Sequence, residues 1–463
     1  MIHSIAMHAG DRPQSRHTTL TPSPAPLLAW AGGVTALLIA GAVWPVAPLR
    51  DAATGAAADA RLHLTPAFVV LAPFNNTLDA LSLLSVREHA AVWLVLIVAY
   101  AAWRVTARRA RRRANPGKRA SGAVHEVQLL AVALLWLVAV YAAGALVSRP
   151  MVAIELPASD SDMVTIDFHS HTSASHDGRT WFSPERNREW HQAAGFDVAY
   201  ISDHFTFAGA DAGVRANPPR AGDGTILFSA IECLEGGQHV NVLGVGSPDY
   251  ALFNGRYLAA AAMEAAIAGG RTRPVVVQTI PGSLGRIPRA GMASVVPVTA
   301  IEVADAAPRG LSDGDRNRAW ILALADSLDL AIVSGSDNHG WGRTAAAWSV
   351  MPVPGWRSLT PPALEQRIED GIRARKRHAV AVIERTRPVW PTAPGARGFG
   401  GWVSIAIGAP RFLVQFIWQL TATRSWPERL SWMAWLWATV LLSMWRGAPG
   451  AGARIEAVVR ETR

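Results

Sequence analysis

The hydrophobic residues of the chain follow two different patterns along its length. In the N-terminal third, residues 26–49, 90–105 and 127–147 form long runs that are almost entirely apolar. Runs of this kind predict helices that cross a membrane. A weaker run over residues 62–86 is interrupted by proline, asparagine and aspartate. This interruption favours a loop or a segment at the membrane surface over a further crossing.

From residue 152 to about residue 389 the apolar runs become short and alternate with amphipathic or alanine-rich stretches. The short runs predict buried strands and the stretches between them predict helices. The expected strands are residues 164–168, 198–202, 226–231, 240–245, 275–279, 300–303 and 331–334. Strands that alternate with helices predict an α/β fold, as either a parallel barrel or a doubly wound sheet.

Three helices of this region can be placed from local signals. They are expected over residues 185–194, 257–268 and 317–328. The first has Ser183 in the N-cap position, Pro184 in its first turn and Gly195 just beyond its end. Each residue type is common at its position, because serine caps a free N–H group, proline has a φ suited to the first turn, and glycine adopts the conformation that ends a helix.

The positive charge of the chain is concentrated in one segment. Residues 104–119 hold seven arginines, one lysine and no acid, so they contribute +8 of the net charge of +9. A basic block beside an apolar run is typical of a cytoplasmic loop. The run at 127–147 then carries the chain outward, so everything after residue 151 is expected outside the cytoplasm. The α/β region lacks a basic stripe with interleaved aromatic residues, so no nucleic-acid partner is expected.

The C-terminal part is again apolar and rich in tryptophan, over residues 402–420 and 430–445. One or two membrane-associated helices are predicted there, with tryptophans at the interface. Four parts are therefore expected: a polar tail (1–25), a membrane region with about three spans (26–150), an α/β domain (152–390) and the tryptophan-rich end (391–463). The single cysteine, Cys233, excludes an intrachain disulfide and is expected to serve packing.

Histidines and carboxylates gather at the ends of the predicted strands. His169 and His171 follow the strand at 164–168, and their spacing of two places both on one face. The other candidates are His176, Asp177, Asp203, His204, Glu232, His239, Asp337, Asn338 and His339. The carboxyl ends of barrel strands converge on one face, and imidazoles with carboxylates suit zinc, manganese or iron. A divalent-metal site is predicted. His191 lies on an expected helix and is expected to be structural or exposed.

Five ordered motifs resemble those of the PHP (polymerase and histidinol phosphatase) domain family. They are Asp-Phe-His-Ser-His-Thr, Ile-Ser-Asp-His, Ile-Glu-Cys, His-Val-Asn-Val-Leu-Gly and Gly-Ser-Asp-Asn-His, within residues 164–350. The resemblance implies a distorted (β/α)7 barrel, and the apolar runs predict transmembrane helices that flank it. The family resemblance also implies two or three divalent ions, Mn²⁺, Zn²⁺ or Fe²⁺.

The resemblance also implies a ligand set for each ion. The first ion would be held by His169, His171, Glu232 and Asp337. Glu232 would bridge to a second ion, which His239 also binds. The third would be held by His204, His339 and a residue of the turn after the first strand, where His176 matches better than Asp177. The family usually has His-Pro after the fifth strand, whereas this chain has Ile280 and Pro281. The second ion should therefore bind weakly, or the site works with two.

The expected activity is metal-dependent hydrolysis of a phosphoester, with a metal-bridging hydroxide as the nucleophile. The catalytic set would be Glu232, His204 and Asp337. Asp203 and Asn338 would orient the metal-bound histidines, and Arg179 and Arg343 would bind a phosphate oxygen. One alternative is hydrolysis of a non-phosphate ester or amide. Another is a non-catalytic membrane receptor with a degenerate metal site, which Ile280 favours. The substrate is expected to be a small-molecule or lipid-headgroup ester. The protein itself is expected to be integral to the plasma (inner) membrane.

Overall fold

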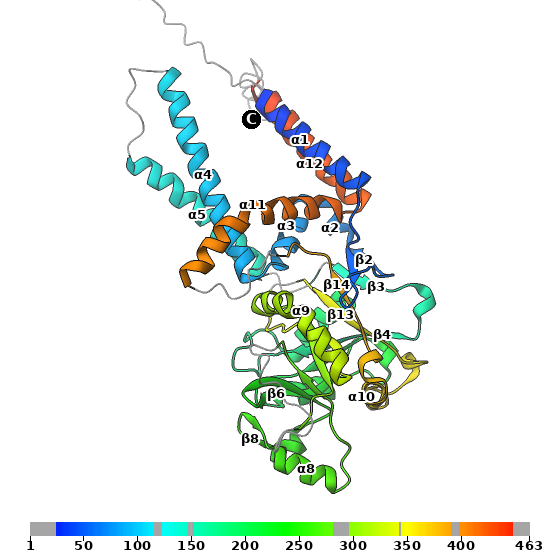
Figure 1. Ribbon diagram of the computed structural model, residues 1–463. Coiled ribbons are helices and arrows are strands. Elements are labelled where there is room, and N and C mark those ends of the chain that lie inside the picture. The colour runs from blue at the N-terminus through cyan, green and yellow to red at the C-terminus, as the bar shows by residue number, and fades with distance from the viewer. Residues whose placement is uncertain are drawn as a thin grey trace, which may run out of the picture.

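The computed structural model describes residues 25–114, 123–146, 150, 152–280, 296–341, 344–389 and 398–447. It has a group of helices on one side and a mixed α/β domain on the other (Figure 1). Three helices are long and apolar enough to cross a membrane, within α1 (Ala25–Val43), α4 (Val86–Ala114) and α5 (Ala123–Leu146). They correspond to the three runs that predicted spans.

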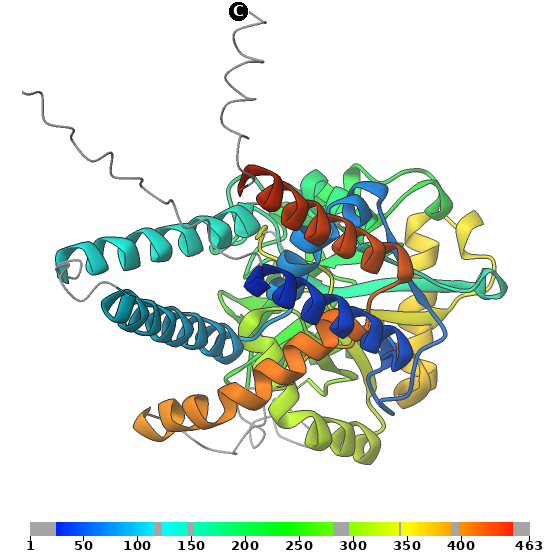
Figure 2. The ribbon, with the colours of Figure 1, turned by 90° about the horizontal axis from the view of Figure 1, so that it is seen from above.

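Two short helices, α2 (Pro66–Val70) and α3 (Ala72–Ser82), occupy the interrupted apolar run, so this segment is too short in each piece to be a span. The C-terminal region forms α11 (Gly398–Ala422) and α12 (Trp426–Gly447). Figure 2 shows α1 between α11 and α12. The backbones of α1 and α11 approach closely at Gly41, where an added Cβ would lie 2.9 Å from the Thr421 carbonyl carbon.

The α/β domain is built on one curled, mixed sheet. Its main strand order is β1-β14-β13-β4-β5-β6-β7-β10-β11-β12. The bounds are β1 (Leu49–Asp51), β14 (Ala381–Arg385), β13 (Ala347–Pro352), β4 (Met163–Ser170), β5 (Val198–Ile201), β6 (Ile226–Glu235), β7 (Gln238–Leu243), β10 (Val276–Gln278), β11 (Ala300–Asp305) and β12 (Ala331–Gly335). The short strands β8 (Phe253–Asn254) and β9 (Tyr257–Leu258) join it at β6, and β2 (Arg61–Leu64) pairs separately with β3 (Val152–Glu155).

The sheet curls until its far end meets β4 again. The backbone N–H of Asp337, just after β12, donates to the His169 carbonyl over 2.9 Å, and the N–H of His171 donates to the Asn338 carbonyl over 3.2 Å. These bonds bring the carboxyl ends of β4 and β12 together. The curled sheet is compatible with the predicted barrel.

Each of the seven predicted strands is present, but one runs in the opposite direction from a simple barrel strand. β7 is antiparallel to both β6 and β10. The reason is the connection after β6, where Gly236 and Gly237 both have positive φ, 56° and 77°. Two such residues make the tight hairpin turn that glycine favours, so no helix separates these strands.

The three expected helices are also present, and two of them begin at other residues than predicted. α6 (Pro184–Ala194) begins as predicted, because the Ser183 hydroxyl accepts the Arg186 N–H and Gly195 ends the helix with φ 82°. α8 (Ala260–Ala268) starts later than expected, since β9 takes the preceding residues, and α9 (Pro308–Leu328) starts earlier, at a proline. Two further helices are α7 (Ala208–Arg215) and α10 (Pro361–Arg375).

Buried ion pairs join the domain to the helices. Arg385, at the end of β14, donates to both carboxylate oxygens of Asp79 in α3, over 2.7 and 2.6 Å, and both side chains are buried. Burial alone would raise the pKa of Asp79, but the Arg385 guanidinium outweighs it and lowers this pKa. Arg387 pairs with Asp315 of α9 within the domain, and its Nη1 lies 3.8 Å from the Glu88 carboxylate of α4. These contacts fix how the helices sit on the domain.

We expect Asp79→Asn to lower the free energy of unfolding by about 3–5 kcal/mol, because it leaves the Arg385 charge buried without a carboxylate. Thermal and denaturant unfolding of the detergent-solubilised chain would measure the loss. Asp370→Asn is the matched control, since Asp370 pairs with Arg373 at the surface and such pairs contribute little. Equal losses in the two variants would contradict the argument.

Candidate metal centre

The centre begins at the carboxyl end of β4. His169 is the penultimate residue of the strand and His171 follows it. Their Nε2 atoms lie 3.0 Å apart and both side chains are buried. Two nitrogens at this distance can face each other favourably only when a proton or a cation lies between them. The spacing of two residues therefore brings both imidazoles to one point.

Glu232 of β6 and Asp337 of the loop after β12 reach the same point. Glu232 Oε2 lies 3.0 Å from His169 Nε2 and 3.2 Å from His171 Nε2. Asp337 Oδ1 lies 3.5 and 3.3 Å from the same two nitrogens. Asp337 has φ 44°, a left-handed conformation that costs a non-glycine residue about 1 kcal/mol or more. This turn directs its carboxylate toward the histidines.

Three of these ligand atoms, from His169, His171 and Glu232, form a group that could hold a cation, and Asp337 lies outside that group but within 3.5 Å of both histidines. A tetrahedral zinc site with bonds of ~2.0–2.2 Å needs neighbouring ligand atoms ~3.3–3.6 Å apart. The five distances given above run from 3.0 to 3.5 Å. Two imidazoles and two carboxylates are also the donor types that zinc, manganese and iron accept. The donor set and its geometry therefore suit a metal ion.

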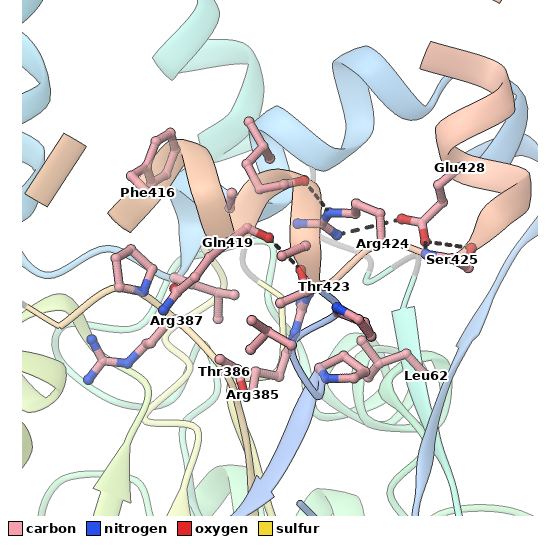
Figure 3. Close-up of a pocket in the computed structure, with 18 of the residues that line it drawn as sticks. Leu62, Arg385, Thr386, Arg387, Phe416, Gln419, Thr423, Arg424, Ser425 and Glu428 are labelled. Atoms are coloured by element: carbon pink, nitrogen blue, oxygen red, sulfur yellow. Dashed lines mark hydrogen bonds and ion pairs between the residues drawn. The ribbon is translucent and has the colours of Figure 1, made fainter. Parts of the chain in front are cut away.

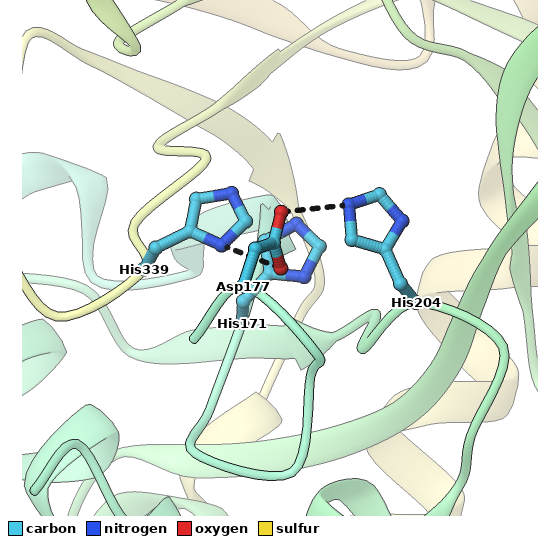
Figure 4. Close-up of side chains that lie close together, drawn as sticks. All are labelled: His171, Asp177, His204 and His339. Atoms are coloured by element: carbon cyan, nitrogen blue, oxygen red, sulfur yellow. Dashed lines mark ion pairs between the residues drawn. The ribbon is translucent and has the colours of Figure 1, made fainter. Parts of the chain in front are cut away.

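Two further groups adjoin the first. His171, His204, His339 and Asp177 bring one ligand atom each within 4.8 Å of one another, and Figure 4 shows the Asp177 carboxylate between the rings of His204 and His339. Asp177 lies 3.3 Å from each of these two rings. The other group is His204, Glu232 and His239, with 2.5 Å between Glu232 Oε1 and His239 Nδ1. Shared residues link the groups into one cluster.

Between the two candidates of the turn after β4, the structure favours Asp177 over His176. The Ser175 hydroxyl donates to Asp177 over 2.7 Å and fixes its carboxylate. His176 is exposed, and it belongs to none of the three groups found among the described residues. The sequence motif alone had favoured His176.

Asp203 and Asn338 hold loops rather than imidazole rings. Asp203 accepts hydrogen bonds from the backbone N–H and the hydroxyl of Thr172, over 2.6 and 2.7 Å. The Asn338 side-chain oxygen accepts the Gly340 N–H over 2.9 Å. Both residues shape the segments that carry the candidate ligands, and in the described part of the chain their side-chain oxygens accept from Thr172 and Gly340 and not from a histidine ring.

The carboxylate that orients His169 is Glu302 of β11, which the sequence analysis missed. Glu302 Oε1 lies 2.8 Å from His169 Nδ1, and its other oxygen accepts the Ile280 N–H over 3.0 Å. Because Nδ1 of His169 bonds to Glu302, Nε2 is left to face the other ligands. The available signal was an acidic residue inside an apolar strand, which needs a buried partner.

A second missed pair fixes the backbone beneath the site. Asp167 accepts the N–H groups of His169 and Ser336 over 3.1 and 2.9 Å, and so ties β4 to the loop after β12. Its other oxygen lies 2.7 Å from His191 Nε2. His191 is buried, so of the two expectations for it, structural or exposed, the structural one is correct.

Arg179 lies at the edge of the centre. Its backbone N–H donates to the His339 carbonyl over 2.9 Å, and its guanidinium lies 3.0 Å from the centre of the Trp341 ring. Its Nε has no hydrogen-bond partner in the described part of the chain. Arg343 lies outside the described residues. Ile280 offers no ligand atom from its side chain, and the Gln278 amide nitrogen donates to the His239 carbonyl over 2.8 Å.

The buried histidines and carboxylates of the centre shift one another's pKa values. Burial alone would lower the pKa of His171, but Asp337 and Glu232 outweigh it and raise this pKa to about 9. His169 has a raised pKa for the same reason, with Glu302 as its strongest carboxylate neighbour. Burial opposes ionisation of Glu232, yet the surrounding histidines hold its pKa well below the usual range. Burial lowers the pKa of His204 to about 4, so this imidazole is neutral at physiological pH.

We expect metal binding to release protons. An imidazole must be neutral to bind a cation, and His169 and His171 both hold protons at pH 7 in the metal-free protein, so about two protons should leave per first ion. The apparent affinity should rise with pH through the pKa of His171, about 9, because both imidazoles must lose their protons. Calorimetric titration of Mn²⁺ in buffers of different ionisation enthalpy measures the proton count. Heat that is independent of the buffer would contradict this charge distribution, and His176→Ala should leave the count unchanged.

No protein-family model matches the sequence, and no curated protein matches it. Among solved structures, similar ones include PsfC from Pseudomonas syringae PB-5123, with 15% identity, TM-score 0.33, and coverage of 55% of this chain and 99% of that one. A candidate metal-dependent phosphoesterase from Bifidobacterium adolescentis has 16% identity, TM-score 0.24, and coverage of 46% and 96%. The lesion-specific endonuclease PfuEndoQ from Pyrococcus furiosus has 14% identity, TM-score 0.31, and coverage of 45% and 56%. These similarities are too distant to carry an argument about function.

Proposed function

We propose that this protein is a divalent-metal-dependent hydrolase of a phosphoester. The observation that carries the proposal is the sharing of ligands between neighbouring groups: Glu232 and His171 each belong to two of them. Shared ligands place cations side by side, which is the arrangement that phosphoryl transfer uses. When bound, such ions would supply Lewis-acid stabilisation of the charge that develops on phosphoryl oxygens.

The first ion would be held by His169, His171, Glu232 and Asp337. His204, His339 and Asp177 would hold another, while His239 with Glu232 and His204 offers a weaker third position. Two or three Mn²⁺, Zn²⁺ or Fe²⁺ ions suit these donors. We also propose that the curled sheet is a distorted (β/α)7 barrel of the PHP type, because the candidate ligands follow one another along the chain in the order of the PHP motifs.

The residues around the ions have separate tasks. Glu302 and Asp167 hold His169 in place, through its ring and its backbone respectively. Arg179 lies next to His339, and its stacking on Trp341 restricts the guanidinium before substrate arrives. We assign it to a non-bridging phosphoryl oxygen, which guanidinium groups bind well.

The test is turnover by the full chain, purified in detergent and loaded with Mn²⁺ or Zn²⁺. Nitrophenyl phosphate, bis-nitrophenyl phosphate and nitrophenyl acetate separate monoester, diester and carboxylic ester hydrolysis. We expect metal-dependent turnover of a phosphate substrate. Turnover of the acetate alone would favour the carboxylic ester alternative. Tight metal binding with no turnover of any substrate would favour the receptor.

We also propose that the chain is integral to the plasma (inner) membrane with its α/β domain outside the cytoplasm, where it meets a small-molecule or lipid-headgroup ester. The support is the basic block at 104–119, which begins in the last residues of the second candidate span, Val86–Ala110, and ends before the third, Val124–Ala142. An extracytoplasmic reporter fused after Ser148 should be active. An inactive reporter, with a cytoplasmic reporter active at the same junction, would reverse this orientation.

A further inference from the structure

A cavity of about 410 Å³ lies where the α/β domain meets the helices (Figure 3). Its walls come from the segment after α1, from β2, from the end of β14 and from the adjoining parts of α11 and α12. None of the candidate metal ligands lines it. α1 ends at Val43, and Pro45 and Val46 already line the cavity. The cavity therefore lies next to the end of a helix that is long and apolar enough to cross a membrane.

Much of the wall is hydrocarbon. Leu62 and Leu64 of β2, Leu83 after α3, and Phe416 and Leu420 of α11 all line it. A cavity with such a lining excludes water and favours an apolar ligand. The walls alone would accept a lipid chain from the adjoining membrane.

Three buried arginines and one buried glutamate line the polar part of the wall, and Asp79 and Asp315, outside the lining, pair with two of the arginines. Arg385, Arg387 and Arg424 are buried in it, and Glu428 is the buried carboxylate among the lining residues. Arg385 has Asp79 within hydrogen-bond distance, as described above. Arg424 has no carboxylate this close: the oxygens of Glu428 and Asp79 lie 3.6 and 3.9 Å from its Nη1. Its Nε donates to the Leu420 carbonyl over 3.1 Å, and its Nη1 donates to the Asn76 side-chain oxygen over 3.5 Å.

Two of these buried groups have an atom with no hydrogen-bond partner among the described residues, namely Nη1 of Arg387 and Oε1 of Glu428. The Arg387 side chain is 5% exposed; its Nη2 pairs with Asp315, and the Glu88 carboxylate lies 3.8 Å from its Nη1. Figure 3 shows Arg424 beside Glu428 at the α11–α12 turn. Guanidinium N–H groups buried without close acceptors are costly, and a phosphate supplies the oxygens that they lack.

We propose that this cavity binds one anionic phospholipid taken from the membrane. Its phosphate would lie on Arg424, whose Nη1 has only long contacts, and an acyl chain would lie along Leu62, Phe416 and Leu420. The site is separate from the metal centre and does not depend on the proposed hydrolase activity. Because both the helices and the domain line the cavity, the bound lipid would join them.

The test uses the full chain in detergent and native mass spectrometry, with phosphatidylglycerol, phosphatidylcholine and inorganic phosphate as separate probes. We expect the wild type to retain one phosphatidylglycerol in preference to phosphatidylcholine, and not to retain inorganic phosphate. Arg424→Gln should weaken retention at least about tenfold, as for the loss of one charged donor. Leu62→Trp, which fills the apolar wall, should weaken it similarly. Arg316→Gln, on α9 and outside the cavity lining, is the control and should retain the lipid.

A melting curve for each variant shows whether it is folded, and Leu62→Trp decides the matter if Arg424→Gln does not fold. Three results would overturn the proposal. These are no retained lipid in the wild type, equal retention by the wild type and Leu62→Trp, and retention of inorganic phosphate without any lipid. Equal retention of the two phospholipids would overturn the anionic preference.

Discussion

Replacing Glu232 by glutamine is expected to reduce hydrolysis at least about a thousandfold, because it removes the carboxylate that neighbouring cations would share. One oxygen of Glu232 faces His169 and His171, and the other faces His239 at 2.5 Å. Glutamine keeps the size of the side chain, but it offers one oxygen and one N–H group. The N–H side cannot accept a cation, so the two groups can no longer share the residue. Metal content and kcat of the purified variant measure this effect.

Glu235→Gln is the matched control, because Glu235 lies on the same strand and belongs to none of the three groups found in the described part of the chain. Burial raises the pKa of Glu235, so the amide replaces a carboxyl that is more easily protonated than usual. It should keep its metal and its activity. Wild-type metal content and kcat in Glu232→Gln would show that Glu232 bridges nothing.

The strands that carry the ligands were predictable because each is short, apolar and followed by polar residues. The strands outside this pattern were not. β1 has three residues, and it pairs with β14 more than 300 positions away, as in Leu49 with Arg385. A three-residue strand has almost no local signal, and its partner is set by tertiary packing. The direction of β7 did have a signal in the sequence, because the glycine pair at 236 and 237 favours a hairpin turn. The prediction of alternating strands and helices did not use this pair.

The sequence indicated which side chains lie together where a candidate ligand follows a strand end, as for His171 and His204. A role that depends on distance in three dimensions was not predictable. Glu302 is 133 residues from the histidine it orients. Asp203 stands beside His204 in the sequence, but its carboxylate turns to Thr172. Adjacency in sequence therefore indicated which segments meet, whereas it did not indicate which side chains touch.

Glu302→Gln is expected to weaken metal binding by about ten- to a hundredfold, the usual effect of losing a carboxylate that supports a ligating histidine. Glutamine can still accept the His169 Nδ1–H through its amide oxygen, so the ring stays in place. The negative charge is lost, and with it the support for the imidazole as an electron donor to the ion. Activity should fall at low Mn²⁺ and recover at high Mn²⁺, which a titration of kcat/KM against metal concentration measures. Recovery at high metal separates a positioning role from damage to the fold.

Glu369→Gln provides the comparison, because Glu369 is also buried but pairs with Arg373 on α10. It should change the melting temperature without moving the metal titration. Glu302→Gln should move the metal titration, and its metal-free form should lose no more melting temperature than Glu369→Gln. The reason is that the glutamine keeps an oxygen for the His169 Nδ1–H and gives up only the bond to the Ile280 N–H. An unchanged metal titration in Glu302→Gln would mean that hydrogen bonding alone positions His169, and that the charge of Glu302 contributes nothing to the centre.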